Sequence, residues 1–258
     1  MHRFRHALVR PPGANFAAGL SSSGLGAPDL ALALRQHARY CEALRQCGLE
    51  LVTLPADEVH PDATFVEDTA VLTAAGALLT RPGAPSRQGE VAAIAAALAR
   101  RHPVGASIVA PGTLDGGDVC ECEQAVYIGL SGRSNAEGAD QLEQWLAAQG
   151  LPLRRIDIRP IRGLLHLKTG MSSLGDGRVA ALAAFAPTLA ATGLDVVPVD
   201  EDESYAANCV RVNDHVLVAA GYPRFEARLV ALGYRPLALE MSEFRRMDGG
   251  LSCLSLRW

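Results

Sequence analysis

The stretch MDGGLSCLSLRW (247–258) decides how the rest of the sequence is interpreted. Its two glycines, Gly249 and Gly250, permit a tight turn, because glycine tolerates backbone conformations that other residues avoid. The alternating apolar run that follows predicts a strand over 250–258. Cys253 falls at the start of this strand, where a thiol can face a pocket. A lone cysteine is more often a buried apolar side chain than a nucleophile, so its meaning depends on the rest of the chain.

The other end of the chain supplies a partner for this strand. The segment HALVRPP (6–12) predicts a strand, a helix follows over 28–47, and ELVTLP (50–55) predicts another strand. Taken with the C-terminal strand, these segments make one unit of strand, strand, helix and strand. The unit is split between the two ends of the chain, so pairing the ends would close a ring.

Four further units repeat the same order. Their first strands are predicted over 65–73, 115–122, 166–174 and 204–212. Their helices are predicted over 86–101 with Ser86 as N-cap, over 135–149, as a short helix before 196, and from Pro223 to about 232. Their last strands are predicted over 106–111, 153–158, 196–200 and 236–240. Five ββαβ units predict a five-bladed α/β propeller in one domain over 1–258, with an ordinary open α/β sheet as the alternative.

Composition excludes several classes of protein. A net charge of −4 gives no electrostatic reason to expect nucleic acid or an anionic membrane as a partner. We find neither a secretory segment nor a run of about 18 apolar residues that could span a bilayer. The six cysteines are expected to be free thiols of a reducing cytoplasm. The pair Cys120 and Cys122 lacks a second pair and spaced histidines, so we expect no metal site and no cofactor.

Polar side chains that resist burial recur at one place in each unit, on the first strand. They are Glu67 and Asp68, then Asp115 and Asp118, then His166 and Lys168, then Asn208, and finally Ser252 and Cys253. In a propeller these strands line the central channel, so a thiol, an imidazole and several carboxylates would converge there. Buried carboxylates need partners, and a cationic ligand would supply one. This recurrence is the reason to favour the propeller over an open sheet.

The loops after the second strands carry arginines, at Arg81, Arg87, Arg133 and Arg224. A guanidinium group binds a carboxylate through two parallel hydrogen bonds. An acidic channel with a basic rim therefore predicts an amino acid with a cationic side chain as the small-molecule ligand.

The chemistry of such a site can be derived from Cys253 and His166. A thiolate can attack a guanidinium carbon if neighbouring carboxylates hold the group planar above the sulfur. His166 can then protonate the leaving amine and activate water for the second half-reaction. Asp115 can orient the imidazole or bind the guanidinium. Taken alone, His166 is explained as well by a structural histidine in the core as by a catalytic one. Glu67 and Asp68, taken alone, are explained by a strand end exposed to solvent.

Several motifs resemble a known enzyme family along nearly the whole chain and in the family's order. They are FVED (65–68), TRPG (80–83), SRQGE (86–90), LDGGD (114–118), SGRSN (131–135), HLKTG (166–170), SYAANC (204–209) and MDGGLSC (247–253). These residues resemble dimethylarginine dimethylaminohydrolase, of the guanidino-modifying superfamily. The resemblance implies the pentein fold, a five-bladed propeller. It also implies hydrolysis of N,N-dimethylarginine and N-monomethylarginine to citrulline and the amine, through a covalent thiouronium intermediate and without a cofactor.

The resemblance also implies roles for individual residues. It makes Cys253 the nucleophile, His166 the proton donor and Asp115 a third catalytic residue, where some relatives carry the longer glutamate. The substrate contacts that it implies are Glu67 and Asp68 for the guanidinium, Asp62 and the carbonyl of Leu20 for the α-amino group, Arg87 and Arg133 for the α-carboxylate, and the carbonyl of Met247. The loop SSSGLGAP (21–28), rich in glycine and serine, is expected to be a mobile lid beside Leu20.

Two other functions are compatible with a five-bladed propeller. Arginine deiminases and amidinotransferases use the same nucleophile chemistry, but they are typically much longer than 258 residues. A non-catalytic propeller of the ribosome anti-association type would have no use for Cys253, His166 and the acids together, and its buried cysteine would react slowly. The sequence leaves the oligomeric state open between a monomer and a homodimer.

Overall fold

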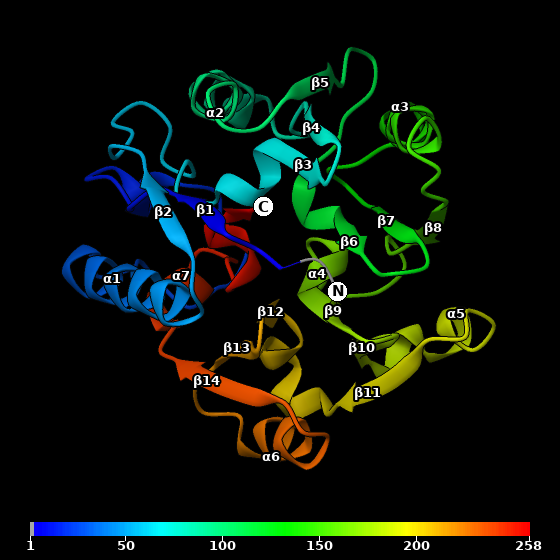
Figure 1. The fold of residues 1–258 in the computed structure, drawn as a ribbon. Helices are drawn as coiled ribbons and strands as arrows, with labels where there is room; N and C mark the ends of the chain where they lie inside the picture. Colours follow the sequence, from blue (N-terminus) through cyan, green and yellow to red (C-terminus); the bar gives the residue numbers. More distant parts are fainter. Residues whose placement is uncertain (1–2) are drawn as a thin grey trace.

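The protein is described by a computed structural model, in which residues 3–258 can be described. Its strands form five three-stranded sheets around a central axis (Figure 1). In the first complete sheet, β3 (Ala70–Thr73) is antiparallel to β4 (Gly76–Leu79), which is parallel to β5 (Val104–Ser107). The other sheets repeat this combination, and the first strand of each lies nearest the axis (Figure 1). The predicted five-bladed α/β propeller is confirmed.

The last strands of the next three sheets lie within one residue of their predicted ranges. The strands of these sheets are β6 (Val119–Glu121), β7 (Val126–Leu130) and β8 (Leu153–Asp157); β9 (Met171–Gly175), β10 (Arg178–Leu182) and β11 (Asp195–Val199); and β12 (Val210–Val212), β13 (His215–Ala219) and β14 (Arg235–Leu239). Each pair of first and second strands is a hairpin, because only a short turn separates them.

The fifth sheet joins the two ends of the chain, as predicted. In it β1 (His6–Val9) pairs antiparallel with β15 (Leu256–Arg257) and parallel with β2 (Glu50–Thr53). The backbone N–H groups of Arg5 and His6 also donate to the carbonyl of Trp258, at 2.8 and 2.9 Å. The ring is therefore closed by contacts between the first and last elements of the chain.

The α-helices that join the second strand of each blade to the third lie on the outside of the ring and cover the sheets (Figure 1). They are α1 (Leu30–Gln46), α2 (Val91–Leu98), α3 (Ala136–Ala147), α5 (Ala186–Leu189) and α6 (Pro223–Ala231). Asp29 caps α1 by accepting from the N–H of Leu32, and Asn135 caps α3 by accepting from the N–H of Gly138. The prediction that Ser86 caps a helix is wrong, because its side chain makes no cap hydrogen bond. The 3-10 helix η3 (Pro85–Glu90) occupies that segment, and α2 starts only at Val91.

The inner strands begin later than predicted, because a short helix precedes each of them. These helices are η2 (Val66–Thr69), η4 (Gly116–Asp118), α4 (Leu167–Gly170), η6 (Glu201–Ala207) and η7 (Ser252–Leu254). Cys253 therefore lies in a helical turn and not at the start of a strand. Helical turns leave backbone N–H groups free to donate to buried polar side chains. The N–H of Gly117 donates to Asp68 in this way, and that of Leu167 to Asp118, both at 2.9 Å.

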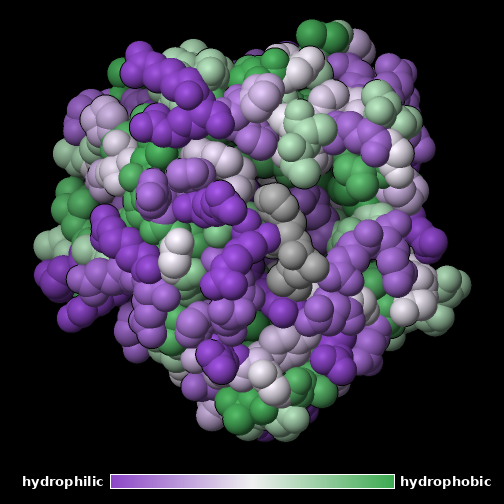
Figure 2. All heavy atoms as spheres, viewed as in Figure 1, coloured by the Kyte–Doolittle hydropathy of each residue, from purple (hydrophilic) through white to green (hydrophobic). Residues whose placement is uncertain are grey.

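The core consists of clusters of apolar side chains that lie between neighbouring sheets and the helices covering them. The cluster that packs on α1 also contains Cys253 and Leu254 of η7. The remaining short helices are η1 (Phe16–Ala18), η5 (Ala183–Phe185) and α7 (Ser242–Arg245). The face seen in Figure 2 is largely hydrophilic, with apolar residues scattered rather than gathered. Among residues 3–258, no helix combines the length and apolar character that crossing a membrane requires.

Candidate active site

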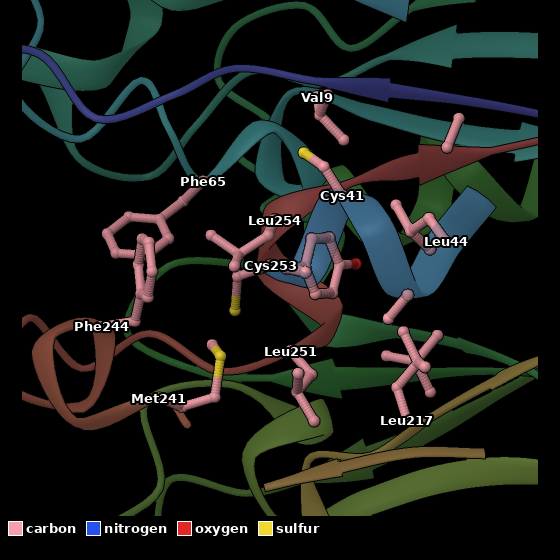
Figure 3. Packing of buried hydrophobic residues seen from close by; sticks show 14 of the residues in the cluster. Val9, Cys41, Leu44, Phe65, Leu217, Met241, Phe244, Leu251, Cys253 and Leu254 are labelled. Atoms are coloured by element: carbon pink, nitrogen blue, oxygen red, sulfur yellow. The ribbon is translucent and has the colours of Figure 1, made fainter. Parts of the chain in front are cut away.

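Cys253 lies near the axis of the ring, on η7, with 9 % of its surface exposed. It belongs to an apolar cluster with Phe244 and Leu251, which Figure 3 shows around it. The N–H of Gly250 donates to its sulfur at 3.4 Å. Burial, together with the carboxylates of Glu67 and Asp68, raises the pKa of the thiol to about 12. In the ligand-free protein the thiol therefore keeps its proton at neutral pH.

The glycines before Cys253 are required for a different reason from the one predicted. The residue of this segment with a left-handed backbone conformation is Asp248, whose φ is 57°. Neither Gly249 nor Gly250 has a positive φ. A Cβ added at Gly249 would lie less than 3.0 Å from the ring of Phe65, and one added at Gly250 would lie equally close to Oδ1 of Asn208. The glycines thus allow the segment to pass close to its neighbours, which positions Cys253.

His166 is held at the start of α4, and its Nε2 lies 3.0 Å from Oδ2 of Asp115. The imidazole is almost completely buried. Burial by itself lowers its pKa, but the carboxylates of Asp68, Asp115 and Asp118 outweigh burial and raise the pKa to about 9. His166 is therefore an imidazolium at neutral pH and can donate a proton.

Asp115 is completely buried and fixed on several sides. Its Oδ1 accepts from the N–H of Gly83 at 2.8 Å, and its own N–H donates to Oγ of Ser134 at 3.0 Å. A guanidinium nitrogen of Arg133 lies 3.6 Å from its Oδ2, the oxygen that faces His166. The shorter aspartate side chain thus reaches the imidazole despite lacking the methylene of glutamate.

Arg87 and Asp68 form a buried ion pair next to His166. Arg87 also donates to both oxygens of Glu90, at 3.0 and 2.8 Å, and to the carbonyl of Phe65 at 3.0 Å. Burial would raise the pKa of Asp68, but His166 and Arg87 lower it to about 2. Asp68 is therefore a carboxylate, and it supports the positive charge on His166.

Glu67 is buried and has two short contacts. Nζ of Lys168 donates to its Oε1, and Oγ of Ser252 donates to its Oε2, each at 2.7 Å. Asn208 completes this layer: its Nδ2 donates to Oγ of Ser252 at 3.0 Å, and its Oδ1 accepts from the N–H of Ser252 at 2.9 Å. These bonds join η2, α4 and η7 beneath Cys253.

A narrow pocket of about 30 Å³ opens beside Cys253. Every residue predicted from the sequence to belong to the site lines this pocket except Asp115 and Glu67. The lining residues from that set are Leu20, Asp62, Asp68, Arg87, Arg133, His166, Met247 and Cys253. Asp62 accepts from the N–H of Leu20 at 3.0 Å, which fixes the segment that carries the carbonyl of Leu20. The structure therefore brings the predicted cations, anions, thiol and imidazole to one place.

Two of the arginines expected at the rim do not reach this pocket. Arg81 donates to the carbonyl of Gly112 at 3.3 Å, and Arg224 pairs with Asp200 at 2.9 Å on the outside of the ring. Arg224 lies in the first turn of α6, and Asp200 and Asp202, at the start of η6, neutralise it. The number of arginines in equivalent loops therefore overestimates the number at the site.

Asp118 organises the site, although it was predicted only as one of the carboxylates that converge on the channel, with no role of its own. This buried carboxylate accepts from Oγ of Ser131 at 2.6 Å, from Oγ of Ser134 at 2.7 Å and from the N–H of Leu167 at 2.9 Å. It thus ties the loop of Arg133 to the helical turn that follows His166. The second aspartate of the LDGGD motif was the signal that could have identified it.

The loop over 21–28 covers the site through contacts that the sequence did not reveal. Oγ of Ser22 donates to Asp248 at 2.9 Å, and Oγ of Ser21 and of Ser23 donate to the carbonyl of Arg246 at 2.6 and 2.7 Å. These bonds hold the loop against the segment that precedes Cys253. No local pattern marks Asp248 as the acceptor of Ser22, or the carbonyl of Arg246 as the acceptor of Ser21 and Ser23.

Three side chains among residues 3–258 are close enough to share a metal ion, namely Asp68, Asp115 and His166. Both carboxylates already face guanidinium groups, those of Arg87 and Arg133. The imidazole is protonated, whereas a metal ligand must be neutral. The cluster is better suited to acid–base chemistry than to holding a metal.

No model of a protein family matches the chain. Among solved structures, the N-terminal domain of ArgZ, an arginine dihydrolase from cyanobacteria, superposes with a TM-score of 0.87 over 99% of this chain and 97% of that one. The two sequences are only 18% identical, so this likeness shows the fold alone.

Closer relatives are found among both sequences and structures. The chain is 41% identical to N(G),N(G)-dimethylarginine dimethylaminohydrolase of Pseudomonas aeruginosa, covering 99% of this chain and 100% of the relative. It is 38% identical to the Streptomyces coelicolor enzyme of the same name, covering 98% and 96%. A mutant of the Pseudomonas aeruginosa protein complexed with citrulline superposes with a TM-score of 0.95 over 100% of both chains at 41% identity. The chain therefore belongs to the dimethylarginine dimethylaminohydrolase family.

Proposed function

We propose that this protein hydrolyses N,N-dimethylarginine, and N-monomethylarginine, to citrulline and the corresponding amine. The observation that carries the proposal is the meeting of Cys253, protonated His166 and the carboxylate of Asp68 at the end of a pocket lined by Arg133 and Asp62. An arginine derivative has a cationic side chain and a zwitterionic backbone, which complement this distribution of charge. The relatives named above support the same reaction.

The backbone of the substrate is proposed to lie in the outer part of the narrow pocket. Asp62 and the carbonyl of Leu20 face the α-amino group, and the carbonyl of Met247 is a further contact. Arg133 and Arg87 face the α-carboxylate. Arg87 is largely neutralised by Asp68 and Glu90, so Arg133, which is less buried, supplies the greater part of the attraction. The pocket is too small as it stands, so the loop over 21–28 opens to admit the substrate.

The guanidinium is proposed to lie between Asp68, Glu67 and the thiol of Cys253. A cation placed beside the sulfur favours the thiolate and offsets the two carboxylates that now disfavour it. The thiol therefore loses its proton to solvent when substrate binds, and the reactive thiolate forms in the presence of its target.

In the first half-reaction the sulfur of Cys253 forms a bond to the central guanidinium carbon. The bond from that carbon to the dimethylamino nitrogen then breaks, and this nitrogen takes the proton of His166. Neutral dimethylamine leaves, and a cationic thiouronium remains on the sulfur. Asp115 keeps the imidazole oriented through the 3.0 Å contact with Nε2.

In the second half-reaction neutral His166 takes a proton from water as the water oxygen attacks the thiouronium carbon. The carbon–sulfur bond breaks, the carbonyl of citrulline forms, and the hydroxyl proton returns to the sulfur. The imidazolium and the thiol are both restored, so the cycle balances without a cofactor. The protein is also proposed to work in the cytoplasm, which its six unpaired cysteines support.

The test is citrulline release by the purified protein from N,N-dimethylarginine, with unmodified arginine and the variant Cys253→Ser assayed beside it. Release from the methylated substrate that disappears in the variant supports the proposal. Release from arginine in preference to dimethylarginine would identify a deiminase instead. No release from either substrate, with a Cys253 thiol that resists alkylation, would support a binding protein.

A further inference from the structure

A second and much larger cavity meets the narrow pocket at Cys253. It has a volume of about 820 Å³, within the range of roughly 300–1,000 Å³ that holds drug-sized ligands. The two cavities share five residues: Leu165, His166, Asp248, Gly249 and Cys253. The sulfur and the imidazole therefore stand at the boundary between a confined space and an open one.

The linings of the two cavities differ in chemistry. The narrow pocket has the charged groups that match an amino acid backbone, Asp62, Arg87 and Arg133. The wide cavity has no such set of charges around an amino acid backbone, and apolar side chains form much of its lining, among polar ones such as Ser204 and Glu201. The apolar residues are Ile161, Leu164, Leu182, Ala183, Val199 and Tyr205. An apolar group entering it would exchange water for these side chains, which is favourable.

Three charged groups that line the wide cavity already have partners. Glu67 and Lys168 bind each other at 2.7 Å. Arg245 lies over the ring of Tyr205, 5.0 Å from its centre, and donates to the hydroxyl of Tyr222 at 3.0 Å. The cavity therefore has space for an apolar group without separating these partners.

The reaction determines what enters this space. The nitrogen that leaves must receive the proton of His166, so it lies on the side of the guanidinium that faces the imidazole. With the amino acid backbone in the narrow pocket, the substituents on that nitrogen point toward the wide cavity. We propose that the wide cavity receives these substituents, so that the protein hydrolyses arginines whose N-substituents are apolar and larger than methyl, such as propyl or benzyl. This inference rests on the proposed function.

The chemical step is the one described for dimethylarginine. The carbon–sulfur bond forms, the bond from the guanidinium carbon to the substituted nitrogen breaks, and propylamine or benzylamine leaves with the proton of His166. Water then releases citrulline, and the thiol is restored. The product that stays in the narrow pocket is identical for every substrate, so only the leaving amine distinguishes them.

The test compares kcat/KM for N,N-dimethylarginine, N-propylarginine and N-benzylarginine, measured as citrulline release by the wild-type protein. In a closely fitting pocket one misplaced methylene changes kcat/KM by about 10–200-fold. We expect kcat/KM for the propyl and benzyl substrates to stay within about tenfold of the dimethyl value. A fall of more than about 100-fold for both would overturn the inference.

The wide cavity can be narrowed by a substitution at an exposed position, which does not disturb the core. Ala183 is exposed and lines the wide cavity, so Ala183→Trp should lower the ratio of benzyl to dimethyl kcat/KM by about tenfold or more. Ala74→Trp is the matched control, on an exposed turn that lines neither cavity, and it should leave the ratio unchanged. An unchanged ratio in Ala183→Trp would count against the inference.

The outcomes separate the inference from the function on which it rests. Turnover of dimethylarginine without turnover of the larger substrates refutes the inference and leaves the proposed function in place. Absence of citrulline from all three substrates refutes the proposed function, and the inference fails with it.

Discussion

Gly117 offers a way to displace His166 by a known amount without altering any reacting group. An alanine Cβ at this position would lie 2.7 Å from Nδ1 of His166 and 2.8 Å from Oδ1 of Asp68. Ordinary contact begins at 3.4 Å, so the imidazole or the backbone must retreat by about 0.7 Å. The substitution Gly117→Ala therefore moves the proposed proton donor relative to the sulfur of Cys253.

A displacement near 1 Å at reacting groups lowers rates by about 10²-fold, so kcat for dimethylarginine should fall by about that factor. KM should change less than kcat, because the added Cβ meets neither Arg133 nor Asp62 and, of the proposed substrate contacts, only Asp68 has to shift. Overpacking of this kind lowers the free energy of unfolding by about 1–3 kcal/mol. Domains of this kind are stable by about 5–15 kcal/mol, so the variant should still fold.

The assay is steady-state citrulline release, with urea unfolding on the same samples to show that the variant is folded. Gly105→Ala is the matched control, because its added Cβ would meet its nearest neighbour, Trp145, at an ordinary 3.4 Å. It should keep wild-type kcat. A folded Gly117→Ala variant whose kcat stays within about threefold of the wild type would refute the placement of His166 as proton donor.

Four further predictions concern the same site. Since the pKa of His166 is raised to about 9, kcat should fall as pH rises above about 9, and a kcat that is flat to pH 10.5 would contradict its role. Burial raises the pKa of Cys253, so the fraction of reactive thiolate should rise about tenfold per pH unit between about pH 6 and 8. Inactivation of the ligand-free protein by iodoacetamide should accelerate by the same factor, and a rate that levels off below pH 8 would contradict the raised pKa. Asp118→Asn should lower the free energy of unfolding by about 1–3 kcal/mol, because a buried acceptor of three hydrogen bonds is weakened; an unchanged urea midpoint argues against this. Asp248→Gly keeps the left-handed backbone but removes the acceptor of Ser22, so subtilisin should cleave the loop over 21–28 faster, and equal cleavage rates would exclude this tether.

The repeat of strand, strand, helix and strand could be predicted because hydrophobic period and turn residues are local signals. The helix over 30–46 and the strands of all five sheets follow from such patterns. What could not be predicted is the short helix before each inner strand. Those segments are too short for a periodic signal, and their conformation depends on partners distant in sequence, such as Asp118 for Leu167.

The candidate site shows the same limit. The residue types and their recurrence in each unit are enough to predict that Cys253, His166 and the carboxylates share one axis. Arg87 bonds to Glu90 within η3, which is a local contact, but its bonds to Asp68 and to the carbonyl of Phe65 arise from the packing of η2 against η3. Together these partners make it a buried structural cation as well as a pocket residue. That positions 249 and 250 require glycine could be recognised from the sequence. The reason could not, because it is the close approach of Phe65 and Asn208, which are distant in sequence.

The pairing of β1 with β15 has a consequence for how the protein is made. A ribosome adds about 5–20 residues per second, so the first strand waits roughly 13–50 s before its partner strand exists. Until then the hydrophobic edge of β1 has only β2 beside it, and the turn that carries Cys253 has not been synthesised. Cys253, the proposed nucleophile, is thus synthesised after the strands of every other blade. A nascent or truncated chain would hold the acids and the histidine but no reactive thiol, so activity would report on completion of the whole ring.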